Sequence, residues 1–139
     1  MGRMTGSATA DISAPMQRCF DIAADVDNIA DWQRGVVGVN VLERDADGRA
    51  LVAAITNDAK VRTITVKVRF RYDAPRGLSW SLVKGDLKSM EGSWVFAEAP
   101  GGTTRATYNL ALDPGMMLGM LARGPVVDKV RDILVSHRP

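Results

Sequence analysis

The sequence predicts an α+β fold: one curved antiparallel sheet of seven strands, two short helices between the first and second strands, and one long C-terminal helix. Three observations lead to this prediction. Apolar and polar residues alternate through most of residues 36–113, as in strands with one buried face. Turn-forming residues divide that stretch at short intervals. Apolar residues recur at helical spacing before and after it.

The N-terminal elements are a strand and two short helices. Residues 5–13 alternate weakly and predict the first strand. Residues 15–24 predict a helix, with Ser13 as a hydroxyl cap and a proline at its start. Asp27 is a good N-cap for a second short helix over residues 27–33. The apolar face of the first helix consists of Met16, Cys19, Phe20 and Ala23.

The middle of the chain predicts a meander of six strands, which the first strand extends to seven. Turns rich in Asp, Gly and Pro delimit these strands, among them Asp45-Ala-Asp-Gly48 and Ala74-Pro-Arg-Gly77. The predicted strands lie near residues 36–44, 49–57, 61–73, 77–84, 87–97 and 103–112.

The C-terminal residues predict a long helix that begins at Asp113 and Pro114 and ends near His137. A cap followed by a proline at the first helical position is a typical helix start. Gly124-Pro125 should kink or interrupt this helix, because proline lacks the backbone donor and clashes with the preceding turn. An apolar sheet face of this length needs such a helix to cover it.

Composition indicates one globular domain over residues 1–139. The chain is 46% hydrophobic and 24% charged, and 18 basic against 16 acidic residues give a net charge of +2. The basic residues are spread along the chain, so we expect no nucleic-acid partner. Lys67, Arg69 and Arg71 alternate with apolar residues and indicate a solvated strand face; the alternative is an anionic partner or membrane headgroups. Neither a signal peptide nor a membrane span is visible, which predicts a cytoplasmic protein without stable membrane insertion.

The residues that usually carry catalysis or bind metals are scarce. His137 is the single histidine and Cys19 the single cysteine, so neither a Ser/His/Asp triad nor a zinc site can be assembled. No glycine-rich phosphate loop joins a strand to a helix. Asp25, Asp27 and Asp31 are explained by capping and solvation. We therefore expect no metal and no cofactor, and assign no catalytic residue.

Two groups of segments carry a family resemblance. Together they resemble the polyketide cyclase/dehydrase and lipid-transport family of the START-like (SRPBCC, helix-grip) superfamily, from about Met4 to Arg138. The segments are Asp11-Ile-Ser-Ala-Pro15, Phe20-Asp-Ile-Ala-Ala-Asp25 and Trp32 near the N-terminus, and Gly92-Ser-Trp94 and Gly101-Gly-Thr-Thr-Arg105-Ala-Thr-Tyr108 later in the chain.

The resemblance implies a helix-grip domain, in which the sheet wraps around the C-terminal helix and leaves an internal cavity closed at one end by the two short helices. The family commonly has a proline just before the tryptophan region. Here Ala30 and Asp31 stand in its place, so we expect a locally different entrance.

Large apolar side chains on one face of the later strands, with the methionine-rich start of the last helix, fit either an ordinary core or the wall of that cavity. The resemblance favours the cavity. Tyr72 and Tyr108 are candidate polar anchors there, unless their hydroxyls make structural hydrogen bonds. The predicted ligand-binding residues are Tyr72, Trp80, Met90, Trp94, Tyr108, Leu110, Met117, Met120 and Leu121.

The leading functional hypothesis is binding or carriage of a small hydrophobic ligand, such as a lipid, polyketide or isoprenoid, with catalysis incidental or absent. The alternative is a polyketide aromatase/cyclase or dehydratase that acts in the same cavity, where Tyr72 or Tyr108 would orient a carbonyl. A third class is a protein-interaction module that uses the outer basic strand or the last helix.

Overall fold

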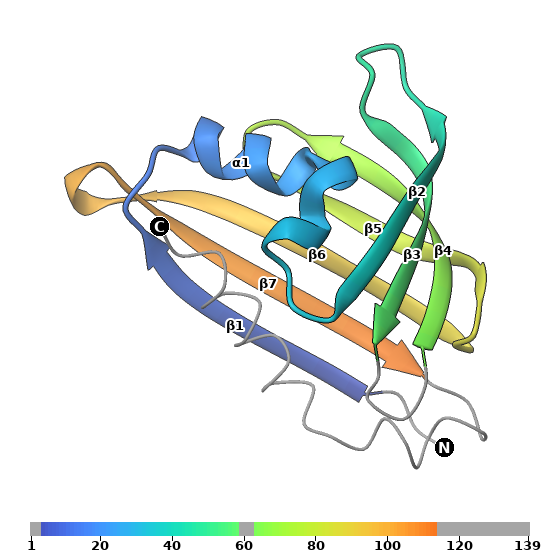
Figure 1. The fold of residues 1–139 in the computed structure, drawn as a ribbon. Helices are drawn as coiled ribbons and strands as arrows, with labels where there is room; N and C mark the ends of the chain where they lie inside the picture. Colours follow the sequence, from blue (N-terminus) through green and yellow to red (C-terminus); the bar gives the residue numbers. More distant parts are fainter. Residues whose placement is uncertain (1–3, 59–62, 114–139) are drawn as a thin grey trace.

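The computed structural model describes residues 4–58 and 63–113, which form a seven-stranded antiparallel sheet and short helices (Figure 1). The strand order is β1-β7-β6-β5-β4-β3-β2, so β2 to β7 form the predicted meander. The strands are β1 (Met4–Ile12), β2 (Val36–Arg44), β3 (Ala50–Asp58), β4 (Thr63–Asp73), β5 (Gly77–Gly85), β6 (Ser89–Ala99) and β7 (Thr103–Asp113).

The first strand joins the sheet beside the last one. β1 pairs with β7 in unbroken register, from Met4 opposite Leu112 to Ile12 opposite Thr104. On the outer face the Ser7 hydroxyl donates to Asn109 Oδ1 at 2.8 Å. This pairing brings together the two ends of the described chain and makes β1 an edge strand of the sheet.

Two short helices lie across the concave face at one end of the sheet (Figure 1). These are α1 (Met16–Ala24) and the 3₁₀ helix η1 (Val26–Asp31). α1 buries Cys19, Phe20 and Ala23 against β5, β6 and β7, which confirms the apolar face predicted for it. A last 3₁₀ turn, η2 (Pro100–Gly102), connects β6 to β7.

The caps predicted for the first two helices were wrong. Pro15 occupies the N-cap of α1, and no side chain caps that helix or η1. Asp27 lies inside η1 and instead accepts two hydrogen bonds from Arg44 in β2, at 2.8 and 3.0 Å. This hydrogen bonding lowers the pKa of Asp27. The carboxylate is satisfied by a residue distant in sequence, which local capping rules do not consider.

The start of α1 is instead fixed to the sheet by Thr104. Its hydroxyl, on β7, donates to the Ala14 carbonyl at 2.6 Å. Tyr108 apart, Thr104 is the one polar residue that is buried in the described part of the chain. The hydrogen bond compensates for burying both groups and sets where α1 crosses the sheet.

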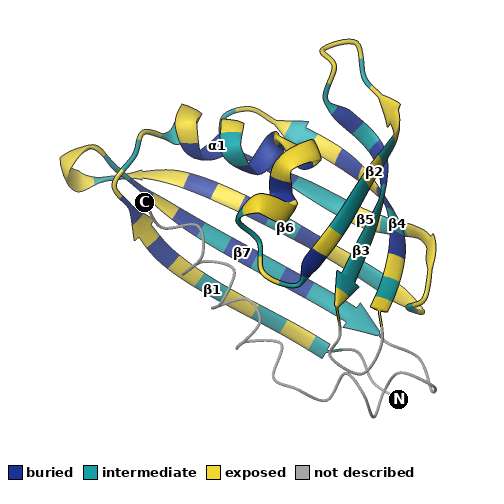
Figure 2. Ribbon diagram, viewed as in Figure 1, coloured by how far each residue is buried: buried dark blue, intermediate teal, exposed yellow. Residues whose placement is uncertain are grey.

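The two faces of the sheet differ in burial as the alternation predicted (Figure 2). Along β4, Val66, Val68 and Phe70 are buried on the concave face, whereas Arg69 and Arg71 are exposed on the other. Glu91 is likewise exposed. The turn predicted at residues 45–48 also forms, with a positive φ at Gly48.

The predicted C-terminal helix and its break at Gly124-Pro125 lie outside the described residues. Among the residues that the structure does describe, no helix is long and apolar enough to cross a membrane.

Candidate functional site

The concave face holds a continuous network of aromatic rings. It includes all eight aromatic residues of the chain, which has three tryptophans, two tyrosines and three phenylalanines. Neighbouring rings lie between 4.8 and 6.4 Å apart, centroid to centroid. Such spacings are typical of favourable edge-to-face and offset contacts. From η1 toward α1 the network runs Trp32, Trp94, Tyr108, Trp80, Phe70, Tyr72 and Phe20, with Phe96 stacked on Trp94.

Tyr108 lies at the centre of this network. Its ring is 4.8 Å from that of Trp94 and 5.6 Å from that of Trp80, and the residue is 3% exposed. Burial raises the pKa of its phenol, with no hydrogen bond contributing to the shift. No partner of the Tyr108 hydroxyl is found in the described part of the chain.

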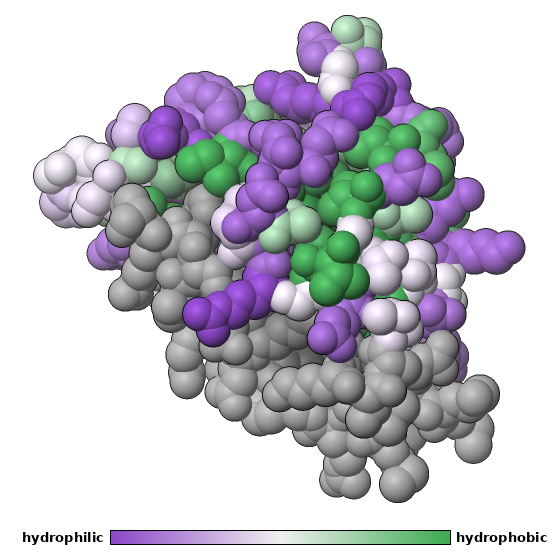
Figure 3. All heavy atoms as spheres, in the orientation of Figure 1, coloured by the Kyte–Doolittle hydropathy of each residue, from purple (hydrophilic) through white to green (hydrophobic). Residues whose placement is uncertain are grey.

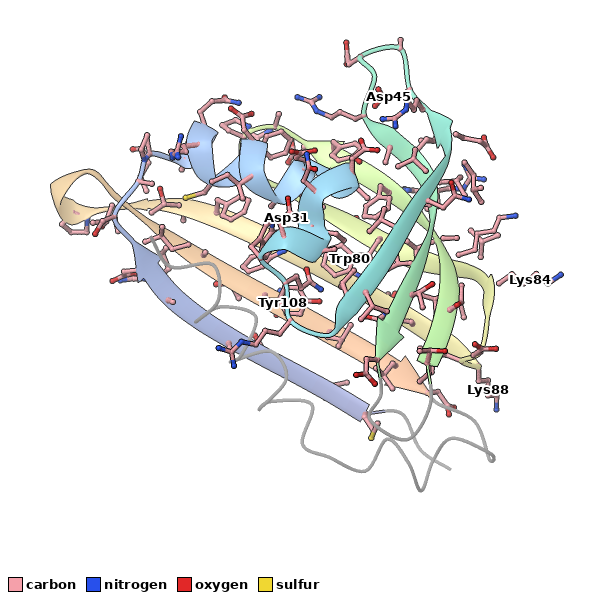
Figure 4. All side chains as sticks on the ribbon, in the orientation of Figure 1. Asp31, Asp45, Trp80, Lys84, Lys88 and Tyr108 are labelled. Carbon is pink, nitrogen blue, oxygen red and sulfur yellow. The ribbon has the colours of Figure 1, made fainter. Side chains whose placement is uncertain are left out.

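That hydroxyl is a buried donor on the concave face of β7 (Figure 4). Buried hydroxyls in a packed interior normally have a hydrogen-bond partner. The Tyr108 hydroxyl is therefore available to donate to a bound molecule on that face.

Trp80 forms a flat wall beside Tyr108, and Gly92 makes room for it. Gly92 is directly opposite Trp80 on the neighbouring strand. A Cβ atom at residue 92 would lie 2.4 Å from Cζ2 of Trp80 and 2.7 Å from its Nε1. The indole therefore lies flat on the glycine backbone, where any larger residue would displace it. Trp80 is only half-buried, unlike Trp94.

The Tyr72 hydroxyl is hydrogen-bonded to the backbone, near α1. It donates to the Ala50 carbonyl at 2.5 Å. Desolvation raises the pKa of Tyr72 to about 12, and the nearby Asp45 carboxylate adds to this shift. The Arg49 guanidinium lies 5.6 Å from the Tyr72 ring centre and 5.2 Å from that of Phe20. The Tyr72 hydroxyl therefore makes a structural hydrogen bond, which was the alternative to its predicted role as a polar anchor for a ligand.

Some of the other predicted ligand-binding residues lie on the concave face, and the rest lie outside the described residues. Trp94 and Leu110 are buried on the concave face beside Tyr108, and Met90 is half-buried on the same face. Met117, Met120 and Leu121 lie outside the described residues. Sequence reasoning missed Trp32 and Phe70 as members of the ring network, although Phe70 falls on the apolar parity of its strand.

On the concave face, the Arg49 guanidinium lies over the Phe20 and Tyr72 rings at the α1 end. No Asp, Glu, Lys or Arg side chain is buried there, and no three His, Cys, Asp or Glu residues gather as metal ligands. Lys84 and Lys88 point away from the sheet at the β5–β6 turn (Figure 4). Hydrophilic side chains cover the outer surface of the helices, and hydrophobic atoms show along β2, where Val37 is 60% exposed (Figure 3).

A hollow of about 700 Å³ lies on the opposite face of the sheet. It is wide open, and its floor is made of small and polar side chains, including Ser7, Ser79, Ser93 and Asn109. Ser7 and Ser93 both hydrogen-bond to Asn109, so these groups already satisfy one another. The concave face, with its enclosed rings and an unbonded hydroxyl, is the better candidate site.

Comparison with known proteins identifies the family and the fold. A family model described as "Polyketide cyclase / dehydrase and lipid transport" matches residues 12–136. No protein of curated function matches the sequence significantly.

Solved structures share the fold at low sequence identity. A START superfamily protein from Mycobacterium smegmatis has a TM-score of 0.80 at 18% identity, over 97% of this chain and 94% of that one. A protein from Thermus thermophilus has a TM-score of 0.82 at 20% identity, over 95% and 92%. The Zhui aromatase/cyclase from a Streptomyces species has a TM-score of 0.72 at 18% identity, over 97% and 84%.

Proposed function

We propose that this chain, which belongs to the polyketide cyclase/dehydrase and lipid transport family, binds and carries a small hydrophobic molecule on the concave face of its sheet. The bound molecule would be a lipid, a polyketide or an isoprenoid-like compound. It would lie against Trp80, Trp94, Tyr108 and Leu110, with Met90 at the less buried end.

The observation that carries this proposal is that Trp80 and Tyr108 are not packed and hydrogen-bonded like residues of an ordinary core. A packed interior leaves few voids and no unsatisfied hydroxyl. Here a half-buried indole adjoins a phenol without a hydrogen-bond partner in the described residues. A concave, mostly aromatic surface with one convergent polar group is typical of small-molecule sites.

The tyrosines of the concave face are unsuited to act as general bases in the alternative function, cyclase or dehydratase catalysis. A general base needs a pKa near the working pH. Burial raises the pKa of both tyrosines in the site region, for Tyr72 to about 12, so both phenols stay protonated near neutrality. Among the described residues, the Tyr108 hydroxyl is a donor that could orient a ligand, and neither phenol is a base that could deprotonate it.

Native mass spectrometry of the protein purified from its own host tests the proposal. We expect a population heavier than the bare chain by the mass of one apolar molecule, which organic extraction removes and identifies. A spectrum of bare protein only, together with failure to take up any apolar probe after purification, would contradict the proposal.

A matched pair of variants locates the bound molecule. Met90→Trp places extra volume on the concave face of β6, and Val95→Trp places the same side chain on the opposite face of that strand, where Val95 is 48% exposed. We expect Met90→Trp to reduce the loaded fraction and Val95→Trp to leave it unchanged. Equal loading of both variants would place the ligand elsewhere.

A further inference from the structure

The polar content of the concave face restricts which apolar molecules fit it. The described face has one hydroxyl without a partner, that of Tyr108, because the Tyr72 and Thr104 hydroxyls already donate to backbone carbonyls. The Arg49 guanidinium contacts this network, but it lies over Phe20 and Tyr72 at the far end of the rings. Tyr108 is separated from Tyr72 by the rings of Trp80 and Phe70.

A carboxylate bound beside Tyr108 would lose its hydration with little in return. An ionised group loses its hydration in such a place and needs a cation or several hydrogen bonds in return. The described face supplies one free hydroxyl there, beside the indole N–H groups of Trp80 and Trp94, and no buried cation. A neutral oxygen loses far less hydration, and one hydrogen bond is enough to compensate for it.

The chemistry of the phenol indicates which neutral oxygen it prefers. Burial raises the pKa of Tyr108, so the hydroxyl keeps its proton. A protonated phenol is a good donor, and its oxygen is a weak acceptor because its lone pair is delocalised into the ring. The group that best satisfies Tyr108 is therefore an acceptor such as a ketone, ester or quinone carbonyl.

We infer that Tyr108 is a specificity-determining residue, and that it selects uncharged apolar ligands carrying a carbonyl-type acceptor over hydrocarbons and over carboxylates of the same shape. This inference rests on the proposed function, because it names the ligand class of the same site. In this inference, Tyr108 donates a hydrogen bond to the ligand, and the rings of Trp80 and Trp94 make the apolar contacts.

Three probes of nearly equal shape test the inference: ethylnaphthalene, acetylnaphthalene and naphthoate, all substituted at the same ring position. Equilibrium dialysis at pH 8 against the delipidated full chain gives their dissociation constants. We expect the ketone to bind about threefold to tenfold more tightly than the ethyl compound, the range of one net hydrogen bond. We expect naphthoate to bind at least about tenfold more weakly than the ketone.

Tyr108→Phe removes the single oxygen at issue, and Tyr72→Phe is its matched control. In Tyr108→Phe the ketone should lose its advantage while the affinity for ethylnaphthalene stays within about twofold. In Tyr72→Phe the ratio between ketone and ethyl compound should not change, because that hydroxyl is occupied by the Ala50 carbonyl. Near-ultraviolet circular dichroism verifies that both variants are folded.

The outcomes separate the two proposals. Equal binding of the ketone and the ethyl compound, a ratio unaffected by Tyr108→Phe, or tighter binding of naphthoate would overturn the role of Tyr108 and leave hydrophobic binding intact. Binding of none of the three probes by the wild-type chain would count against both.

Discussion

The two ends of the concave face are built differently. At the α1 end the side chains of Leu78, Phe96 and Thr104 are buried beneath the helix. At the other end the residues on the same strands and the same face, Leu82, Met90 and Leu112, are only half-buried. One sheet therefore carries a closed core at one end and a less covered apolar surface at the other, and Trp80 and Tyr108 lie where the two meet.

This difference shows that strand alternation decides which face is apolar but not how tightly it is packed. α1 crosses only the strand ends nearest to it (Figures 1 and 2). Substitutions of similar size should therefore cost more free energy beneath α1 than at the transition to the less covered end.

The largest effect is expected for Phe20→Ala. Phe20 is 0% exposed and contacts both Tyr72 and Arg49 from α1. Loss of a fully packed phenylalanine costs about 3–5 kcal/mol of unfolding free energy. Urea denaturation measures it, with Val95→Ala on the exposed face as a control that should change stability by less than about 0.5 kcal/mol. A small loss would mean that α1 is not the closed end of the core.

Trp80→Ala should cost less, although tryptophan is the larger side chain. One face of the indole rests on Gly92, while the residue as a whole is half-buried. A side chain that borders a void loses fewer contacts, so we expect a loss below about 3 kcal/mol in the same urea titration. A loss equal to or above that of Phe20→Ala would indicate a solid interior at Trp80 and would remove the contrast between the two ends.

Gly92→Ala tests the contact between residue 92 and the Trp80 ring, at the boundary between the two ends of the face. The new methyl group would collide with the Trp80 ring, which must move away at a cost of about 1–2 kcal/mol. In a Trp80→Ala background the same change should be neutral or slightly stabilising, because alanine suits a strand better than glycine. The double-mutant cycle gives the coupling energy directly. Additive effects would show that Trp80 does not depend on Gly92 for its position.

The smallest effect concerns the pair that ties η1 to β2. Arg44 lowers the pKa of Asp27, so the pair contributes stability above the unfolded pKa of about 4 and loses it as the pH falls through the lower folded value. Both side chains are about half exposed, so Asp27→Asn should cost only about 0.2–1 kcal/mol at pH 7. The difference from wild type should disappear near pH 2 in thermal melts; a difference that persists there would point to a non-ionic cause.

Most of the sheet could be predicted from the sequence because its signals are local. The turn at residues 45–48 and the alternation through β4 and β7 each depend on a few adjacent residues. Strand ends differed by one or two residues from those predicted, as at β6, which was predicted over residues 87–97 and spans Ser89–Ala99. The family resemblance is confirmed by a match over residues 12–136.

The details of the site could not be predicted because they depend on contacts across strands. The alternation of apolar and polar residues placed Tyr72 and Tyr108 on the same face. It did not indicate that, of the two, only Tyr72 donates a hydrogen bond to a backbone carbonyl. It also gave no sign that Trp80 would lie on Gly92, which requires the register between β5 and β6. The cap prediction for Asp27 failed because its partner Arg44 is 17 residues away in sequence.

The pairing of β1 with β7 has a consequence for how the chain reaches its folded state. Ser7 and Asn109 are 102 residues apart, so β1 is synthesised well before β7 and must wait for it before the two can pair. Contacts of such high sequence separation slow folding, and an unpaired strand edge is a template for aggregation in the meantime. β1 is suited to this delay, because Thr5, Gly6, Ser7 and Thr9 make it a small, polar strand with little tendency to associate on its own.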